Sequence, residues 1–455
     1  MRPITGLADN GDFPKVLAHL DVCDPNRERD VLQYVHPAYI IDPGCHWDSR
    51  LASSETLFVR ILKVARWNGR RSIGITDAGK AHLCVALAGL AVLLWALHNA
   101  SPVFRFGITP LVILIFSDVV YVSYLNSFYM DAASMVFLLL TVALGCAAIL
   151  RPRVWVAIAF GFAGVLLALS KTQHVVTGFL FAGLAGWLAL QAFRGRRRPA
   201  ACWWATSAVA IVTAAVFTIG MTPEDYKAEP LYSLIFYTLL PASQDRVAAI
   251  AELGLPAADL RFAGTHAYSP GVPVTTPEWR ENFISQVSYG NLLMYYVHHP
   301  SVPLRLVRHG LTDFAPAMRP GNLANYERED GFPPDTLAQR FDLWSHLRAW
   351  FLWVFPAQLV IFYGLMGSGA LLCIWRAEWA ARWPLYPLVL VLAASGTLEF
   401  LFPVLLDATE TARHLFFFHV ITETLIVCAL GAVLSLVVGQ AFSLPRPLAG
   451  TSEDA

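Results

Sequence analysis

The chain has 455 residues, of which 56% are hydrophobic and 15% are charged, and its formal net charge is zero. Its mean hydropathy is +0.51, whereas a soluble domain usually carries about 25% charged residues. The composition excludes an ordinary soluble domain, and the balanced charge gives no sign of a nucleic-acid partner. Because the apolar residues occur in blocks of about 20, the length that crosses a bilayer, we predict an all-α polytopic membrane protein.

Residues 1–80 form a polar segment that precedes the first apolar block, and we predict that they are an external first loop. The loop contains ADNGDF near its start, with carboxylates at Asp9 and Asp12. It also contains Cys23 and Cys45, which either form a disulfide in an oxidising compartment or remain two unpaired thiols. In ETLFVRILKVARW (55–67) cations alternate with apolar residues, and this pattern indicates an amphipathic helix in the membrane interface.

Nine apolar segments are predicted to span the membrane, in two groups within residues 81–221 and 347–438. The predicted spans are 81–98, 107–126, 131–150, 153–170, 174–193, 202–221, 347–375, 383–404 and 413–438. Between the groups, residues 222–346 contain short helical patterns and are expected to form an external helical region. Residues 439–455 are expected to be a disordered cytoplasmic tail.

Basic residues orient the predicted spans, because cytoplasmic loops are enriched in lysine and arginine. Arg105, RPR (151–153), RGRRR (194–198) and WRAEWAARW (375–383) all fall on one side if the spans alternate. That side is therefore the cytoplasm, and the N-terminus lies outside. An external N-terminus with no preceding span predicts that a further N-terminal span is missing from this sequence.

Polar residues gather near the predicted outer ends of the spans, where several external links present acids, cations and amides to one face. Taken singly, each of these residues can equally be a solvated loop residue near the lipid headgroups. Asp118 is harder to explain in this way, because a charge within an apolar run is costly unless it is paired or faces a cavity. Besides Asp9 and Asp12, the set comprises Asp118, Tyr121, Asn126, Ser127, Tyr129, Asp131, Lys171, Gln173, His174, Glu399, Asp407, Glu410, Arg413 and His414.

These residue types suit one chemistry. A carboxylate at the outer surface can act as a general base toward an acceptor hydroxyl. Cations such as Lys171 and Arg413 can bind a phosphate leaving group through charge-assisted hydrogen bonds. The aliphatic ends of the predicted spans leave room for a lipid tail. Together, the carboxylates, the cations and this space favour sugar transfer from a polyprenyl-phosphate donor on the outer side of the membrane.

Four short stretches of the chain form a recognisable set: NGDF (10–13), SSE (53–55), SDVVYVSYLNSFY (117–129) and ETARHLF (410–416). With them the chain resembles the GT-C superfamily of integral-membrane glycosyltransferases, and within it the bacterial glycan-biosynthesis hexose transferases of the WsfD type. The resemblance implies a catalytic acid in the first external loop, followed by amphipathic helices on the membrane. The chain departs from the family layout in lacking the first span and in carrying Met130-Asp131 after NSFY.

The resemblance implies roles for individual residues. Asp12 is the expected general base, and Asp9 is the second candidate or positions the acceptor. The two carboxylates could also hold a divalent cation, and no other cofactor is implied. The expected ligands of the donor phosphate are Lys171, Arg413 and His414. The residues expected to bind substrate or to position the loop are Glu55, Asp118, Tyr121, Asn126, Tyr129, Gln173, His174 and Glu410.

The expected activity is inverting transfer of a hexose to a cell-surface glycan or lipid-linked acceptor, outside the bacterial inner membrane. Two other functions stay open. A transporter or flippase for lipid-linked glycans would also need polar residues within the membrane, although such proteins commonly carry internal repeats and this chain has none. A ligase or polymerase of lipid-linked glycans would typically use a large external loop rich in arginine and histidine.

Overall fold

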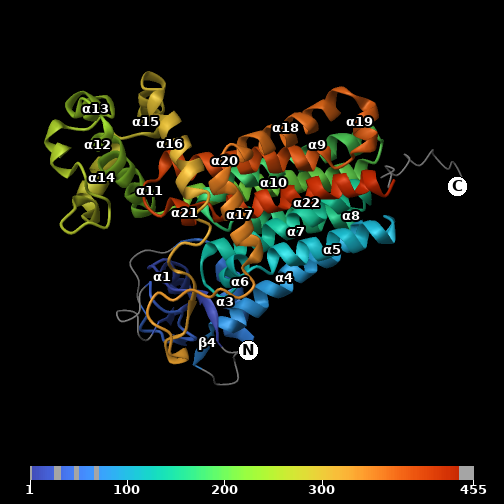
Figure 1. The fold of residues 1–455 in the computed structure, drawn as a ribbon, viewed down its shortest axis with the longest axis horizontal. Coiled ribbons are helices and arrows are strands. Elements are labelled where there is room, and N and C mark those ends of the chain that lie inside the picture. The colour runs from blue at the N-terminus through green and yellow to red at the C-terminus, as the bar shows by residue number, and fades with distance from the viewer. Residues whose placement is uncertain (1–2, 25–31, 46–50, 66–70, 440–455) are drawn as a thin grey trace, which may run out of the picture.

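The computed structural model describes residues 3–24, 32–45, 51–65 and 71–439. A long helical bundle makes up most of the molecule, and two smaller parts sit at one of its ends (Figure 1). One of them is the N-terminal region and the other is a helical lobe. The prediction of a nearly all-helical polytopic membrane protein is confirmed.

Among the described residues, ten helices build the bundle. They are α4 (Ile75–Ala96), α5 (Pro102–Phe116), α6 (Val119–Leu125), α7 (Met130–Leu150), α8 (Val154–Ala168), α9 (Val175–Arg194), α10 (Arg198–Gly220), α18 (Gln358–Trp375), α20 (Tyr386–Leu406) and α22 (Phe416–Val437). Seven spans among the described residues are long and apolar enough to cross a membrane, and α5 with α6 makes an eighth if the bent pair counts as one. The remaining predicted span, 153–170, corresponds to α8, which has only 15 residues.

Two of the predicted spans are interrupted. Between α5 and α6 the chain bends by 69°, because Asp118 caps α6 through a hydrogen bond that its Oδ1 accepts from Val120 N at 3.0 Å. The predicted span 347–375 divides into α17 (Leu343–Val354) and α18, with Pro356 between them. Proline has no N–H to continue a helical hydrogen-bond ladder, so a break at this position is expected.

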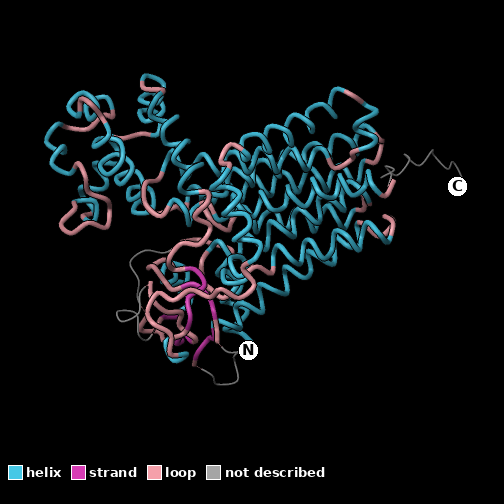
Figure 2. The backbone as a smooth tube through the Cα atoms, in the orientation of Figure 1, coloured by secondary structure: helices cyan, strands magenta, loops and turns pink. Residues whose placement is uncertain are grey.

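The N-terminal region contains short strands that the sequence patterns did not predict. It holds α1 (Phe13–Leu17), the 3₁₀ turn η1 (Ala18–Leu20) and a sheet in the order β2 (Val22–Cys23), β3 (Ala38–Ile41), β4 (Ser72–Gly74). The strands appear together at one end of the molecule in Figure 2. Cys23 and Cys45 form a disulfide with their Cα atoms 5.9 Å apart, which decides between the two alternatives left open by the sequence.

The predicted amphipathic helix is α3 (Glu55–Ala65), and the last two residues of the predicted range lie outside the described residues. Phe58 and Val59 are buried against the bundle, whereas Leu57, Ile61 and Val64 are exposed. The three exposed residues are three or four positions apart and share one face of the helix. This leaves an apolar stripe where the prediction places the membrane interface.

The helical lobe corresponds to most of the predicted external region. Its elements are α11 (Glu224–Tyr232), the π-helical segment η3 (Ser233–Leu239), α12 (Leu240–Ala242), α13 (Arg246–Glu252), η4 (Ala257–Phe262), η5 (Pro273–Thr275), α14 (Pro277–Gln286), α15 (Tyr289–His298), α16 (Ser301–His309) and η6 (Gly310–Phe314). Tyr232, Phe236 and Phe283 are fully buried in its own core. The chain then passes through β5 (Leu323–Tyr326), which pairs antiparallel with β1 (Thr5–Leu7), and η7 (Arg328–Asp330) before it reaches α17. The predicted external region is therefore joined to the N-terminal region by a strand pair.

The loops that carry the basic runs all lie at the end of the bundle opposite the N-terminal region (Figure 1). Reporter fusions at Arg197 and Arg382, the latter in α19 (Ala377–Arg382), are expected to report a cytoplasmic location. Fusions in the lobe, for example at Ser285, are expected to report an external one. A cytoplasmic report from the lobe would contradict this topology.

Candidate functional site

A continuous cluster of charged and polar side chains lies where the bundle meets the N-terminal region. Four segments that are far apart in sequence contribute to it: residues 9–15, residues 129–131 at the start of α7, the link 171–174, and the link 407–414 with α21 (Thr411–His414). The cluster brings together most of the residues that the sequence singled out.

Asp12 lies between two cations at this junction. Its Oδ2 accepts a hydrogen bond from Arg413 Nη1 at 2.9 Å, and its Oδ1 is 3.2 Å from Lys15 Nζ. Burial alone would raise the pKa of Asp12, but the charges of Arg413 and Lys15 and the hydrogen bond from Arg413 outweigh it and hold that pKa well below its ordinary value. The Asp12 side chain is nevertheless 15% exposed. It is an ionised carboxylate that a bound molecule could reach.

Arg413 connects three acidic or aromatic groups. Its Nη2 donates to Glu410 Oε2 at 2.8 Å, in addition to the bond from Nη1 to Asp12. Its guanidinium carbon lies 5.0 Å from the centre of the Tyr129 ring. Glu410 adopts a left-handed backbone conformation with φ of 55°, and this turn places its carboxylate beside the arginine.

Asp9 occupies a different environment from Asp12. Its Oδ1 accepts hydrogen bonds from Gly11 N at 2.8 Å and Phe13 N at 3.1 Å, so it caps the turn that leads into α1. Gly11 takes a positive φ of 104° in this turn. The two carboxylates thus serve different partners, and no group of three or more metal-binding side chains occurs among the described residues.

Asn10 and Asn322 belong to the cluster but were missed by the sequence interpretation. Asn10 Nδ2 donates to both Glu410 oxygens at 3.0 Å, and Asn10 Oδ1 accepts from Tyr129 Oη at 2.5 Å. Asn322, just before β5, donates from Nδ2 to Tyr129 Oη at 3.2 Å. Asparagine gives no signal in an apolar pattern, and only its position between the two acids of NGDF could have drawn attention to Asn10.

Lys171 is buried in an ion pair with Asp131, whose two oxygens both lie 3.1 Å from Lys171 Nζ. His174 Nδ1 is 2.9 Å from Glu399 Oε2 and links this pair to α20. Gln173 Nε2 donates to the His414 carbonyl at 3.0 Å, which ties the pair to the Arg413 region. Asp131 and Glu399 were visible in the sequence as acids near span ends, but no spacing rule identifies their partners.

Replacing Lys171 by methionine is expected to lower the free energy of unfolding by about 3–5 kcal/mol, because it leaves Asp131 charged and buried without its cation. The double variant Lys171→Met, Asp131→Leu is expected to recover most of this loss. Thermal unfolding of the detergent-solubilised protein measures both effects. If Lys171 also binds the donor phosphate, the double variant recovers stability but not donor use. Equal stability of the single variant and the original protein would contradict the ion-pair assignment.

His414 lies at the edge of the cluster and pairs with Asp407 through Nδ1. Its Nε2 lies 3.2 Å from Arg413 Nη2. With 19% of its side chain exposed, His414 is one of the accessible groups beside Asp12.

Four predicted site residues lie outside the cluster. Glu55 is fully buried, 3.1 Å from His82 Nε2. Asn126 Nδ2 donates to the Thr5 carbonyl at 2.8 Å and so holds β1 against α6. Asp118 Oδ2 accepts from Ser345 N at 2.9 Å, in addition to capping α6. The fourth, Tyr121, packs at the same junction, with its ring centre 6.1 Å from that of Phe416.

The helical lobe reaches the same cluster from outside. Lys15 Nζ lies 5.5 Å from the centre of the Tyr226 ring. Farther along, Tyr268 Oη donates to Glu229 Oε2 at 3.4 Å, and the Glu229 charge acts on Lys15. The sequence interpretation did not assign these lobe residues to the site.

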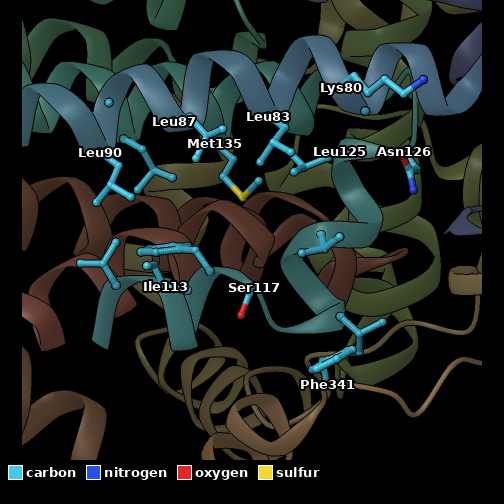
Figure 3. Close-up of a pocket in the computed structure, with 18 of the residues that line it drawn as sticks. Lys80, Leu83, Leu87, Leu90, Ile113, Ser117, Leu125, Asn126, Met135 and Phe341 are labelled. Atoms are coloured by element: carbon cyan, nitrogen blue, oxygen red, sulfur yellow. The ribbon is translucent and has the colours of Figure 1, made fainter. Parts of the chain in front are cut away.

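An apolar groove of about 830 Å³ opens between α4, α5, α7 and α22. Leucines on α4 and Ile113 on α5 line its sides, and Asn126 and Lys80 lie toward one end (Figure 3). That end also includes Thr5, in the same N-terminal segment as Asp12. The groove has the shape and lining to hold a hydrocarbon chain.

The fold and the site define a multi-pass membrane protein with a buried ion-pair cluster at one end of its bundle. A family model described as the YfdI N-terminal transmembrane domain matches residues 1–443, and the chain belongs to this family. No curated protein and no solved structure matches the chain.

Proposed function

We propose that the protein is a membrane glycosyltransferase that moves a hexose from a polyprenyl-phosphate donor to a glycan or lipid-linked acceptor. The observation that carries the proposal is the placement of Asp12, an ionised and partly exposed carboxylate between Arg413 and Lys15. The family is GT-C-like, which agrees with this activity. The closer likeness to WsfD-type hexose transferases is part of the proposal.

In the proposed reaction Asp12 takes the proton of the acceptor hydroxyl, and the freed oxygen attacks the anomeric carbon of the donor sugar. The bond between that carbon and the phosphate oxygen breaks, and its electron pair leaves with the polyprenyl phosphate. Attack from the face opposite the leaving group inverts the anomeric configuration. Arg413, His414 and Lys171 are the proposed phosphate ligands, and Lys15 is added because 21% of its side chain is exposed.

The low pKa of Asp12 needs explanation, because a carboxylate stabilised by two cations is a weak base. A donor phosphate that takes hydrogen bonds from Arg413 would draw the guanidinium away from Asp12. The burial of Asp12 would then raise its pKa and make it a better proton acceptor. In this proposal the same arginine holds the base ionised in the free enzyme and releases it when the donor binds.

The groove between α4 and α5 supports a lipid donor. Its lining is mostly apolar, as a polyprenyl chain requires, and its polar end meets the two segments that carry Asp12 and Tyr129. The Cys23–Cys45 disulfide and the basic loops at the far end of the bundle support an external site. We assign it to the periplasmic side of a bacterial inner membrane.

The test is an assay of membranes from expressing cells with a panel of polyprenyl-phosphate hexoses labelled in the sugar. The expected result is transfer of one labelled sugar to an extractable glycan or lipid, with none in membranes that carry the Asp12→Asn variant. Movement of a lipid-linked glycan across the membrane without transfer would instead indicate the transporter. The panel also identifies the sugar.

A further inference from the structure

A second charged pair lies inside the bundle, apart from the cluster around Asp12. Arg348 of α17 donates from Nε to Glu423 Oε1 of α22 at 3.0 Å. Arg348 is 6% exposed and Glu423 is completely buried. Ionisable residues are rare in the apolar part of a membrane protein and commonly mark a functional site, yet the proposed transfer reaction does not use this pair.

Arg348 has a buried hydrogen-bonding group without a partner in the described part of the chain, and it also lines a groove. Its Nη2 is buried and has no acceptor among the described residues, and the same holds for Nε2 of Gln358 at the start of α18. Both side chains line a groove of about 540 Å³ between α17, α18 and α22. A buried donor without an acceptor costs about 1–3 kcal/mol. A bound molecule with hydrogen-bond acceptor oxygens would therefore satisfy these two donors.

The rest of the groove is apolar and open to lipid. Leu347, Phe351, Phe355, Ile361 and Leu365 line it and are each more than one third exposed. They offer a surface for a hydrocarbon chain below the arginine.

Helix α17 carries the features of the membrane–water interface. Trp350 is 59% exposed and Trp353 is 71% exposed, and exposed tryptophan is enriched at the level of the lipid headgroups. Ser345, at the start of the helix, donates its N–H to Asp118 at the outer end of the bundle. Arg348 thus lies close to the level that a phospholipid phosphate occupies.

The groove is separate from the Asp12 cluster. Glu423 follows Arg413 by ten residues, and ten residues of α-helix rise by about 15 Å along the helix axis. Phe416 lies between Arg413 and Glu423 along the chain, and its ring stacks on that of Tyr124 with centroids 3.5 Å apart. A sugar attached to a phosphate at Arg348 could not reach Asp12, so this groove does not hold the donor during transfer.

We propose that the groove binds a membrane glycerophospholipid, whose phosphate accepts hydrogen bonds from Arg348 Nη2 and Gln358 Nε2 and whose acyl chain lies on Phe351 and Phe355. A lipid seated there fills the space between α17 and α18 and satisfies both donors. The proposal does not depend on the transfer reaction.

The experiment is native mass spectrometry of the purified full chain, titrated with phosphatidylglycerol or with a diacylglycerol of the same acyl chains. Phosphatidylglycerol is expected to bind at least about tenfold more tightly than the diacylglycerol, since only it carries a phosphate. Arg348→Met alone would leave Glu423 charged and buried, so the double variant Arg348→Met, Glu423→Leu replaces the pair with apolar side chains. The double variant and Gln358→Leu are each expected to weaken phosphatidylglycerol binding.

Arg305→Ala removes an exposed cation from α16 and is the matched control, with binding expected to be unchanged. Binding that is equal in the double variant and the original protein would overturn the proposal, as would equal binding of the diacylglycerol. Preferential binding of a polyprenyl phosphate over phosphatidylglycerol, lost in the double variant, would reassign the groove to the carrier lipid.

Discussion

The Asp12→Asn variant is expected to lower turnover by about 100-fold or more while the protein stays folded. Asparagine keeps the size of the side chain and can still accept a hydrogen bond from Arg413, but it cannot take a proton from the acceptor. Arg413 also keeps its bond to Glu410, so the cluster does not lose its main connections. The initial rate of sugar transfer in membranes, at equal protein levels, measures the effect.

Asp9→Asn is expected to lower turnover less, because the Asp9 carboxylate accepts backbone N–H groups and an amide oxygen can replace it in that role. Asp21→Asn is the matched control: Asp21 lies in the same region with φ of 54°, which asparagine tolerates. An Asp12→Asn variant that transfers sugar at the original rate would rule out Asp12 as the base. An equal loss in Asp9→Asn would mean that the two carboxylates act together.

The helices were predictable because each rests on a local pattern, a run of about 20 apolar residues that only a helix can place in a bilayer. The interruptions were less visible. Asp118 was noticed as a charge in an apolar run, but a composition window does not show that it caps a helix at a 69° bend. Pro356 gave a local signal, although a single proline within a span is also compatible with a continuous kinked helix.

The strands escaped prediction for a different reason. With two to four residues each, they are too short to show an alternating pattern. β1 and β5 pair with one another in a register that sets Thr5 opposite Tyr326. A contact between residues more than 300 positions apart has no trace in one sequence.

The candidate site shows the same division. Asp12 and Arg413 stood out as residue types suited to base and phosphate chemistry, and the structure brings them to 2.9 Å. The pairing of Lys171 with Asp131 and the role of Asn10 follow from the way four chain segments converge. Residue types and motifs therefore identify candidate residues, whereas the electrostatic interactions between them, including those that lower the pKa of Asp12, depend on the fold.

Replacing Arg413 by alanine is expected to lower turnover by about 10²–10³-fold, as the loss of one charge-stabilising donor does elsewhere, and also to change the pH dependence. A general base works when ionised, so activity falls as the pH drops through its pKa. In the original protein that pKa lies well below its ordinary value of about 3.9, and Asp12 sets no acid limit near neutral pH. Without Arg413, the charge of Lys15 is the main influence that still lowers the pKa of Asp12. The effect of burial then dominates, and this pKa rises.

The acid limb of kcat/KM is therefore expected to move to higher pH in Arg413→Ala. Arg413→Lys should restore part of both effects, because one ammonium cannot contact Asp12 and Glu410 with the planar fork that arginine offers. A pH–rate profile between about pH 4.5 and 8 distinguishes control of Asp12 ionisation from a merely structural role of Arg413. A folding defect lowers the rate without moving the acid limb of the profile. An unchanged profile in the alanine variant would show that Arg413 does not control the ionisation of Asp12, and the base would have to be sought among the other accessible groups of the cluster.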